Sequence, residues 1–279
     1  MKIISWNVNG IRAVAKKGLK EFVAEQNPDI LCLQETKAFE EQFLKDVGNL
    51  DGYKYVWHTG TRAGYAGTVI FYREDIDVID TKNDFNEVEH FHSDGRVTEL
   101  EFFYSSNSEK DSETSSEGQK EKQHIVLLNG YFPNGGMRAD GTDMVPYKLD
   151  FYDHMIHYTS ELVKAGKQVI VTGDLNICHT EIDIARPKEN QNSVGFLPVE
   201  RAKVSEFLDA GFVDVWREQN PDTLDVYSWW SYRGGARARN VGWRIDYFVV
   251  NKDFFPKVKD MKYMCDTLGS DHCPILLEI

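Results

Sequence analysis

Residues 168–176 read QVIVTGDLN, a run of β-branched residues that ends in glycine, aspartate and asparagine. This composition is typical of a buried strand that runs into a turn. The preceding segment, 144–165, predicts a helix that stops at Gly166, because apolar side chains recur on one face at spacings of three, four or seven: Val145, Leu149, Tyr152, Ile156 and Val163. A helix followed directly by such a strand favours an α/β fold.

Strand-like runs rich in Val, Ile and aromatic residues recur along the rest of the chain, at 2–8, 29–34, 53–59, 67–73, 96–104, 124–132, 245–250 and 274–279. A second helix is predicted over 198–210, between Pro198 and Gly211. Strands this numerous, with helices between them in both halves, predict a layered α/β sandwich rather than a helical bundle or an all-β barrel.

The segment 105–122, SSNSEKDSETSSEGQKEK, stands apart because it holds no apolar residue larger than threonine. It cannot bury enough surface to order itself. The runs on either side, 96–104 and 124–132, resemble the two arms of a hairpin. We therefore expect a mobile loop inserted in a single domain that spans 1–279, rather than a linker between two domains.

The composition, with 41% hydrophobic residues in 279, is that of a soluble globular protein. The opening apolar run is too short for a signal peptide, and no stretch reaches the roughly 20 apolar residues of a membrane span. We expect an intracellular monomer that does not bind membranes, cytoplasmic in a bacterium or archaeon (at the nucleoid) and nuclear in a eukaryote. The four widely spaced cysteines predict reduced, structural thiols.

The net charge of −13 disfavours indiscriminate binding to nucleic acid, unless the basic residues gather in one place. Residues 232–244, YRGGARARNVGWR, are such a place: Arg233, Arg237, Arg239 and Arg244 occur there without an acidic residue. A solvated basic loop is one interpretation. The interleaved Tyr232 and Trp243 favour the other, a nucleic-acid contact in which aromatic rings stack and cations meet phosphates.

Polar residues cluster at the ends of five predicted strands, where side chains leave the core but their backbones stay rigid. A turn or helix cap would explain any one cluster. Together they could hydrolyse a phosphodiester with a hard divalent metal. Glu35 would bind the metal, Asn7 and Asn9 would help to orient it, and Asp174 would orient or deprotonate water. Hydrogen bonds to phosphate or water would come from Asn134 and Asn176, and a partner for His272 from Asp246.

The segment 269–275, GSDHCPI, places a serine, an aspartate, a histidine and a cysteine side by side. A Ser-His-Asp relay among them is excluded because adjacent side chains diverge. Cys273 precedes Pro274 at the start of an apolar strand, so packing is a better interpretation than a nucleophile. His272 is the chemically active candidate of this segment.

Seven motifs together resemble the exonuclease III family of abasic-site DNA endonucleases: WNVNGIR, LCLQETK, GYFPNGG, GDLNICHTEID, GFLPVER, NVGWRIDYF and GSDHCP. They occur in the family's order from residue 2 to residue 275. The resemblance implies a four-layer α/β sandwich, two packed mixed sheets flanked by helices with the site at one edge. It further implies an Mg²⁺-dependent enzyme, with Mn²⁺ as an alternative, that cuts duplex DNA 5′ to an abasic site and leaves a 3′-hydroxyl, with 3′ exonuclease or phosphodiesterase activity as an option.

The resemblance also implies roles for single residues. Glu35 corresponds to the metal-binding glutamate, Asp174 to the residue that handles the water, and His272 with Asp246 to the pair that stabilises charge at the phosphate. Phosphate and water positioners would be Tyr131, Asn134, Asn176 and Asn7. Asp271 resembles an alternative metal ligand or its support, and Asp183 a residue that supports the electrostatics of the site. Trp229 and Trp243 resemble the walls of a pocket for an extrahelical sugar.

The chain departs from the family pattern at three places. Asn9 stands where some members have aspartate, Met137 stands where others have a DNA-contacting arginine that Arg138 could replace, and the 105–122 insertion is foreign to the pattern. Two other functions remain open from sequence. One is a phosphatase or phosphodiesterase of the same superfamily acting on inositol phosphates or lipids, and the other is a DNA-binding homologue without catalysis.

Overall fold

The structure is a computed structural model that describes residues 1–83, 91, 93–105 and 122–279. The predicted loop 105–122 lies outside the described residues except for its two end positions. Within the described part, two six-stranded sheets form the centre of the molecule. The first sheet has the order β11 (Asp260–Tyr263), β12 (Ile275–Glu278), β1 (Lys2–Asn7), β2 (Ile30–Gln34), β4 (Thr68–Arg73), β3 (Tyr53–His58).

The second sheet has the order β5 (Asp77–Lys82), β6 (Val97–Ser105), β7 (Lys122–Tyr131), β8 (Gln168–Asp174), β10 (Asp246–Asn251), β9 (Phe212–Asp214). Both sheets are mixed, because β1 and β2 run parallel in the first and β7 and β8 in the second, while the other pairs are antiparallel. The predicted hairpin is confirmed: β6 and β7 pair antiparallel from Val97 opposite Gly130 to Ser105 opposite Lys122.

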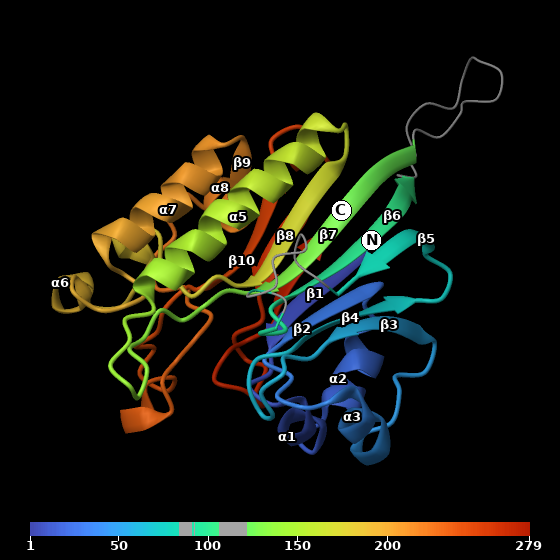
Figure 1. Ribbon diagram of the computed structural model, residues 1–279, viewed down its shortest axis with the longest axis horizontal. Helices are drawn as coiled ribbons and strands as arrows, with labels where there is room; N and C mark the ends of the chain where they lie inside the picture. Colours follow the sequence, from blue (N-terminus) through green and yellow to red (C-terminus); the bar gives the residue numbers. More distant parts are fainter. Residues whose placement is uncertain (84–90, 92, 106–121) are drawn as a thin grey trace.

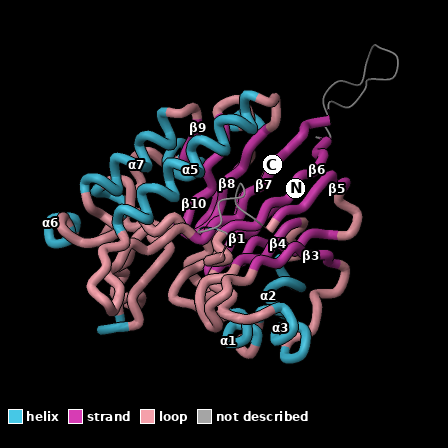
Figure 2. The backbone as a smooth tube through the Cα atoms, viewed as in Figure 1, coloured by secondary structure: helices cyan, strands magenta, loops and turns pink. Residues whose placement is uncertain are grey.

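Helices cover the outer face of each sheet, which gives the four predicted layers (Figures 1 and 2). The first sheet is covered by α1 (Ile11–Ala15), α2 (Leu19–Gln26) and α3 (Glu40–Asp46). The second is covered by α5 (Val145–Lys164) and α7 (Pro198–Asp209). Two short helices, α6 (Pro187–Asn190) and α8 (Val215–Gln219), lie in connecting segments. In the described residues no helix is both long and apolar enough to cross a membrane.

The alternation of side chains along a strand explains how one strand serves two cores. In β7, Ile125 and Leu127 belong to the core between the sheets, whereas Val126 and Leu128 pack against the helices outside. Successive side chains of a strand point to opposite faces. A strand that is apolar at every position therefore marks a layer that is covered on both sides.

The buried face of α5 differs from the predicted one. The helix has the predicted bounds to within a residue, but Val145, Leu149, Ile156 and Val163 are only partly buried. The buried face is turned by about one residue and consists of Lys148, Phe151, Tyr152, Met155, Thr159 and Leu162. The predicted residues Ile156 and Val163 border this face and pack against the same core, and Lys148 is completely buried within the face.

Candidate active site

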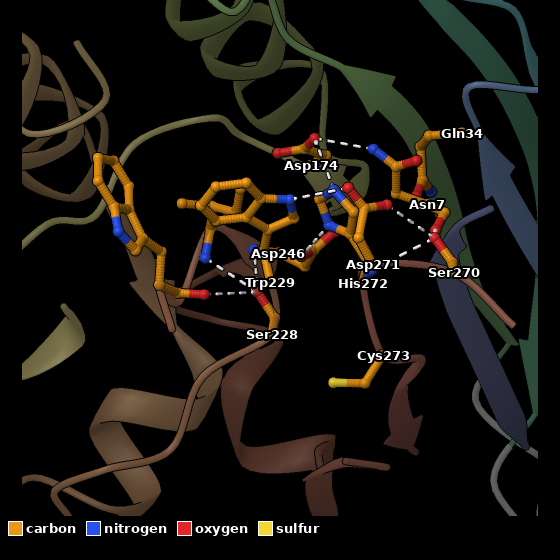
Figure 3. Close-up of polar contacts among 12 residues, drawn as sticks. Asn7, Gln34, Asp174, Ser228, Trp229, Asp246, Ser270, Asp271, His272 and Cys273 are labelled. Carbon is orange, nitrogen blue, oxygen red and sulfur yellow. Dashed lines mark hydrogen bonds and ion pairs between the residues drawn. The ribbon is translucent and has the colours of Figure 1, made fainter. Parts of the chain in front are cut away.

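The sheet register brings the predicted catalytic residues to one edge of the sandwich. In the second sheet, Asp174 at the end of β8 lies between Tyr131 of β7 and Asp246 of β10. In the first sheet, Asn7 ends β1 beside the end of β2, and Glu35 follows β2 with a left-handed φ of 51°. The two sheets face each other, so their strand ends meet there, and residues far apart in sequence share one site (Figure 3).

His272 and Asp246 form a buried pair. The His272 Nδ1 lies 2.8 Å from the Asp246 Oδ2, and both side chains are at most 4% exposed. Burial alone would lower the pKa of His272, but the charges of Asp246 and Asp174 raise it to about 10. At neutral pH the ring is therefore a cation that donates from Nδ1 to Asp246 and presents its Nε2 proton to the site.

Asp174 is the centre of the site. Its Oδ2 accepts a hydrogen bond of 2.9 Å from Asn7 Nδ2 and lies 3.8 Å from His272 Nε2. Its Oδ1 accepts from the backbone amide of Asn176 at 2.9 Å. Burial and the nearby carboxylates of Asp246 and Glu35 raise the pKa of Asp174 above its usual value, against the attraction of His272. A carboxylate with such a pKa accepts a proton more readily than an ordinary aspartate.

Ligand atoms of Glu35, Asp174 and His272 lie within 4.8 Å of one another. Because the protonated ring of His272 has no free lone pair, Glu35 and Asp174 are the two residues that could hold a metal ion. The two carboxylates supply the hard oxygen atoms that Mg²⁺ and Mn²⁺ prefer. Glu35 Oε1 accepts from Asn7 Nδ2 at 2.9 Å, and Glu35 Oε2 forms an ion pair of 2.6 Å with Lys37 Nζ. Sequence reasoning missed Lys37, although it stands two residues after Glu35.

The other predicted metal ligands are engaged with protein groups. Asn7 turns its amide nitrogen, not its carbonyl, toward the carboxylates of Glu35 and Asp174. Asn9 donates to Asp271 Oδ1 at 2.9 Å, and Trp229 Nε1 donates to Asp271 Oδ2 at 3.1 Å. Both oxygens of Asp271 are thus occupied by hydrogen bonds, and the bond to Oδ2 fixes the indole of Trp229 (Figure 3).

These groups line a pocket of about 190 Å³. Trp229 and Trp243 form one corner of it, with ring centroids 5.8 Å apart and planes at 84°. The remaining lining residues are Glu35, Tyr131, Asn134, Asp174, Asn176, Val194, Gly195, Ile245, Asp271 and His272. Burial, together with the charges of Glu35 and Asp174, raises the pKa of Tyr131 well above its usual value, so its phenol stays neutral and can donate. The pocket thus combines titratable and amide groups with two aromatic rings.

The arginine-rich segment divides into two kinds of residue. Arg233 and Arg239 are exposed. Arg237 is half-buried, stacks on Trp230 and donates to the carbonyl oxygens of Ser270, Cys265 and Thr267 at 2.7 to 3.0 Å. Its hydrogen bonds hold the segment that leads to His272.

Arg244 is a correction to the predicted DNA contacts. It is completely buried and forms ion pairs of 2.7 Å with Asp183 and Asp214. Asp183 accepts from Arg217 as well, at 2.6 Å, and although burial opposes ionisation, the two guanidinium groups lower the pKa of its carboxyl. A buried guanidinium cannot reach DNA, so Arg244 supports the loops beneath the site. The sequence pattern of four arginines did not distinguish it from the exposed ones.

Met137 and Arg138 are exposed beside the pocket, with 75% of Met137 accessible. They line a neighbouring cavity of about 670 Å³, which meets the first pocket at Asn134. Sequence reasoning missed its other cations, Arg62 and Arg96. Arg62 and Arg96 lie in different segments, and no sequence motif indicates that they line the same cavity.

A two-sheet α/β sandwich with two carboxylates, a carboxylate–histidine pair and a metal-binding geometry at its edge is suited to hydrolysis of phosphate esters. The comparison with protein families agrees with this class. The chain belongs to the Endonuclease/Exonuclease/phosphatase family, whose model matches residues 4–272. The resemblance identified in the sequence and the predicted fold are thereby confirmed.

Individual relatives span the whole chain. An exodeoxyribonuclease of Bacillus subtilis (strain 168) is 39% identical over 281 residues, covering 100% of this chain and 99% of the relative. A DNA-(apurinic or apyrimidinic site) endonuclease of Dictyostelium discoideum is 37% identical and covers 99% of this chain and 69% of the relative. Among solved structures, the AP endonuclease LMAP from Leishmania major has a TM-score of 0.84 at 31% identity, covering 99% of this chain and 86% of that one.

Proposed function

We propose that this protein is a DNA repair nuclease that hydrolyses the phosphodiester 5′ to an abasic site in duplex DNA. The observation that carries the proposal is the shared pocket of the carboxylate–histidine group and the two tryptophans. At about 190 Å³ it is smaller than the roughly 300–1,000 Å³ of pockets for drug-sized ligands. A deoxyribose without its base is a small group that such a pocket would accept once it is turned out of the helix.

In the proposed reaction, Asp174 orients a water molecule and receives its proton while the water oxygen attacks phosphorus. The bond from phosphorus to the 3′ oxygen of the upstream nucleotide breaks, and that oxygen takes a proton from water and leaves as the 3′-hydroxyl. Charge that develops on the phosphate oxygens is met by the His272 cation, which Asp246 keeps oriented and charged. The neutral phenol of Tyr131 and the amide of Asn134 add hydrogen bonds. Asn176 keeps a fixed place because its Nδ2 donates to the Phe132 carbonyl at 2.9 Å.

A divalent metal would be held by Glu35 and Asp174, and we propose Mg²⁺, with Mn²⁺ as its substitute. Such an ion supplies charge neutralisation at the phosphate and at the leaving oxygen. The fit rests on two converging carboxylates and on the neutral residue at position 9. With Asn9 and Lys37 beside Glu35, the described residues offer few negative charges for a second ion, which favours a single metal.

One incubation separates the rival functions. The substrates are a duplex with a single abasic analogue, an inositol phosphate and a sphingomyelin vesicle, each with Mg²⁺ and with EDTA. We expect Mg²⁺-dependent incision of the duplex alone. Release of phosphate from the inositol phosphate, or of phosphocholine from sphingomyelin, would favour the phosphatase or phosphodiesterase, and duplex binding without incision would favour an inactive DNA-binding homologue.

Replacing Glu35 with alanine should raise the Mg²⁺ concentration needed for half-maximal incision by about an order of magnitude, because one of two anionic ligands is lost. The measurement is a Mg²⁺ titration of the incision rate. Glu25→Ala, at an exposed position of α2, is the matched control and should titrate like the parent. An unchanged titration for Glu35→Ala would remove this residue from the ligand set.

Arg239→Ala and Arg237→Ala should affect different properties, the salt dependence of DNA binding in the first variant and the melting temperature in the second. Arg239 is exposed, so its loss should flatten the salt dependence of duplex binding by about one unit of slope, with little change in melting temperature. Arg237→Ala should lower the melting temperature, because three carbonyl oxygens lose their donor. Equal salt slopes for Arg239→Ala and the parent would mean that the basic segment is only a solvated loop.

A further inference from the structure

Lys148 and Glu200 form an ion pair that is completely buried at the inner end of α5 and α7. Lys148 Nζ lies 2.6 Å from Glu200 Oε1, and neither side chain is exposed. An ammonium group has three donors. The other two bond to the backbone carbonyl oxygens of Asn134 at 3.1 Å and Asn176 at 2.7 Å. The Lys148 ammonium would be costly to bury alone, but Glu200 and two backbone carbonyl oxygens satisfy it. Both carbonyl oxygens belong to asparagines that line the pocket.

Glu200 uses its second oxygen on an adjoining stretch of the pocket wall, where a Cβ added at Gly195 would lie 3.2 Å from the Asn176 carbonyl oxygen. Glu200 Oε2 accepts from the backbone amides of Gly195 at 2.6 Å and Leu197 at 3.0 Å. Gly195 has a left-handed φ of 94°, and its Cα lies so close to Trp243 that an added Cβ would stand 2.8 Å from the ring. Glu200 therefore fixes the backbone against which one of the two tryptophans rests.

The pair connects these walls without lining the pocket itself. Asn134, Asn176, Val194, Gly195 and Trp243 line it, and Lys148 and Glu200 do not. Helix α7 begins at Pro198 and α5 at Val145, so both charged residues sit in the first turns of helices that the core holds rigidly. Displacement of the pair would move both groups of wall residues together.

We propose that the buried pair of Lys148 and Glu200 is a positioning device of the site, which sets the distance between the asparagine side of the pocket and its Gly195–Trp243 side. The proposal rests on the proposed function, because the effect of that distance is measured as the rate of abasic-duplex incision. An error of about 1 Å in the placement of reacting groups can cost about 10²-fold in rate. The pair acts through the pocket residues and does not touch the substrate.

The first test is Lys148→Met, which keeps an unbranched side chain of nearly the same length and removes the ammonium group with its three donors. We expect kcat for abasic-duplex incision to fall by about 10- to 10²-fold with KM within about threefold, since the loss lies in the placement of groups at the transition state. Val204→Ala, one turn beyond Glu200 in the buried face of α7, is the matched control for lost stability. Assayed well below both melting temperatures, it should keep the kcat of the parent.

The second test asks whether Lys148 acts through the asparagines. In a parent that already carries Asn134→Ala and Asn176→Ala, Lys148→Met should lower kcat by a smaller factor than in the unmodified protein, because the part of its effect that runs through the asparagine side chains is already lost. A kcat of Lys148→Met equal to that of Val204→Ala, or an undiminished loss in the alanine background, would overturn the proposal. If Lys148→Met does not fold, Glu200→Gln carries the same comparison, since it keeps the side-chain length and removes the charge. An unmodified protein that leaves abasic DNA intact would overturn the proposed function instead.

Discussion

His272→Asn should lower kcat for abasic-duplex incision by at least about 10²-fold while the affinity for abasic DNA stays within about an order of magnitude. The reason is that the cation at His272 is held 2.8 Å from Asp246 and turned toward the pocket, where charge develops in the transition state rather than in the bound substrate. Single-turnover incision and equilibrium binding to an uncleaved duplex measure the two quantities separately.

His157→Asn is the control for this substitution, because His157 is exposed on α5. It should incise at the parental rate. His272→Asn incising within about threefold of the parent would contradict the role assigned to the His272–Asp246 pair.

Asp174→Asn should lower kcat by about 10²- to 10⁴-fold, the range that general acid–base catalysis contributes. The amide keeps the shape and accepts the hydrogen bond from the backbone of Asn176, but it cannot take a proton from water. It also removes one of the two carboxylates that converge on the metal position. Asp209→Asn, at the exposed end of α7, is the control. Turnover near the parental value would show that another residue handles the water.

Much of the fold could be predicted because its strands are covered on both faces. The middles of β7 and β8, residues 125–128 and 169–171, are continuously apolar, and the glycine, aspartate or asparagine that follows each run favours a short buried strand. The edge strand β5 escaped prediction because most of its residues are partly or fully exposed and it contains two aspartates. An edge strand needs no apolar pattern, and its pairing depends on a partner that local sequence does not reveal.

The sequence predicted which residues belong to the site, but not which of them contact one another. Asp174, Asp246 and His272 stand at strand ends in sequence, and the register then places them together. Lys148 and Arg244 were beyond prediction for a physical reason. A charged residue is expected at the surface, and it becomes stable in the interior only when partners from distant segments satisfy it. Those partners come close only in the folded chain, so the local sequence does not identify them.

The central claim is tested most directly by the chemical ends left in a duplex with one abasic site after incubation with the protein and Mg²⁺. Mass spectrometry of the products should find a 3′-hydroxyl on the upstream fragment and a 5′-sugar phosphate on the downstream one, and EDTA should abolish both. An unsaturated sugar on the upstream 3′ end, which marks cleavage on the other side of the lesion, would contradict the account. So would an intact duplex, or incision that EDTA leaves unchanged.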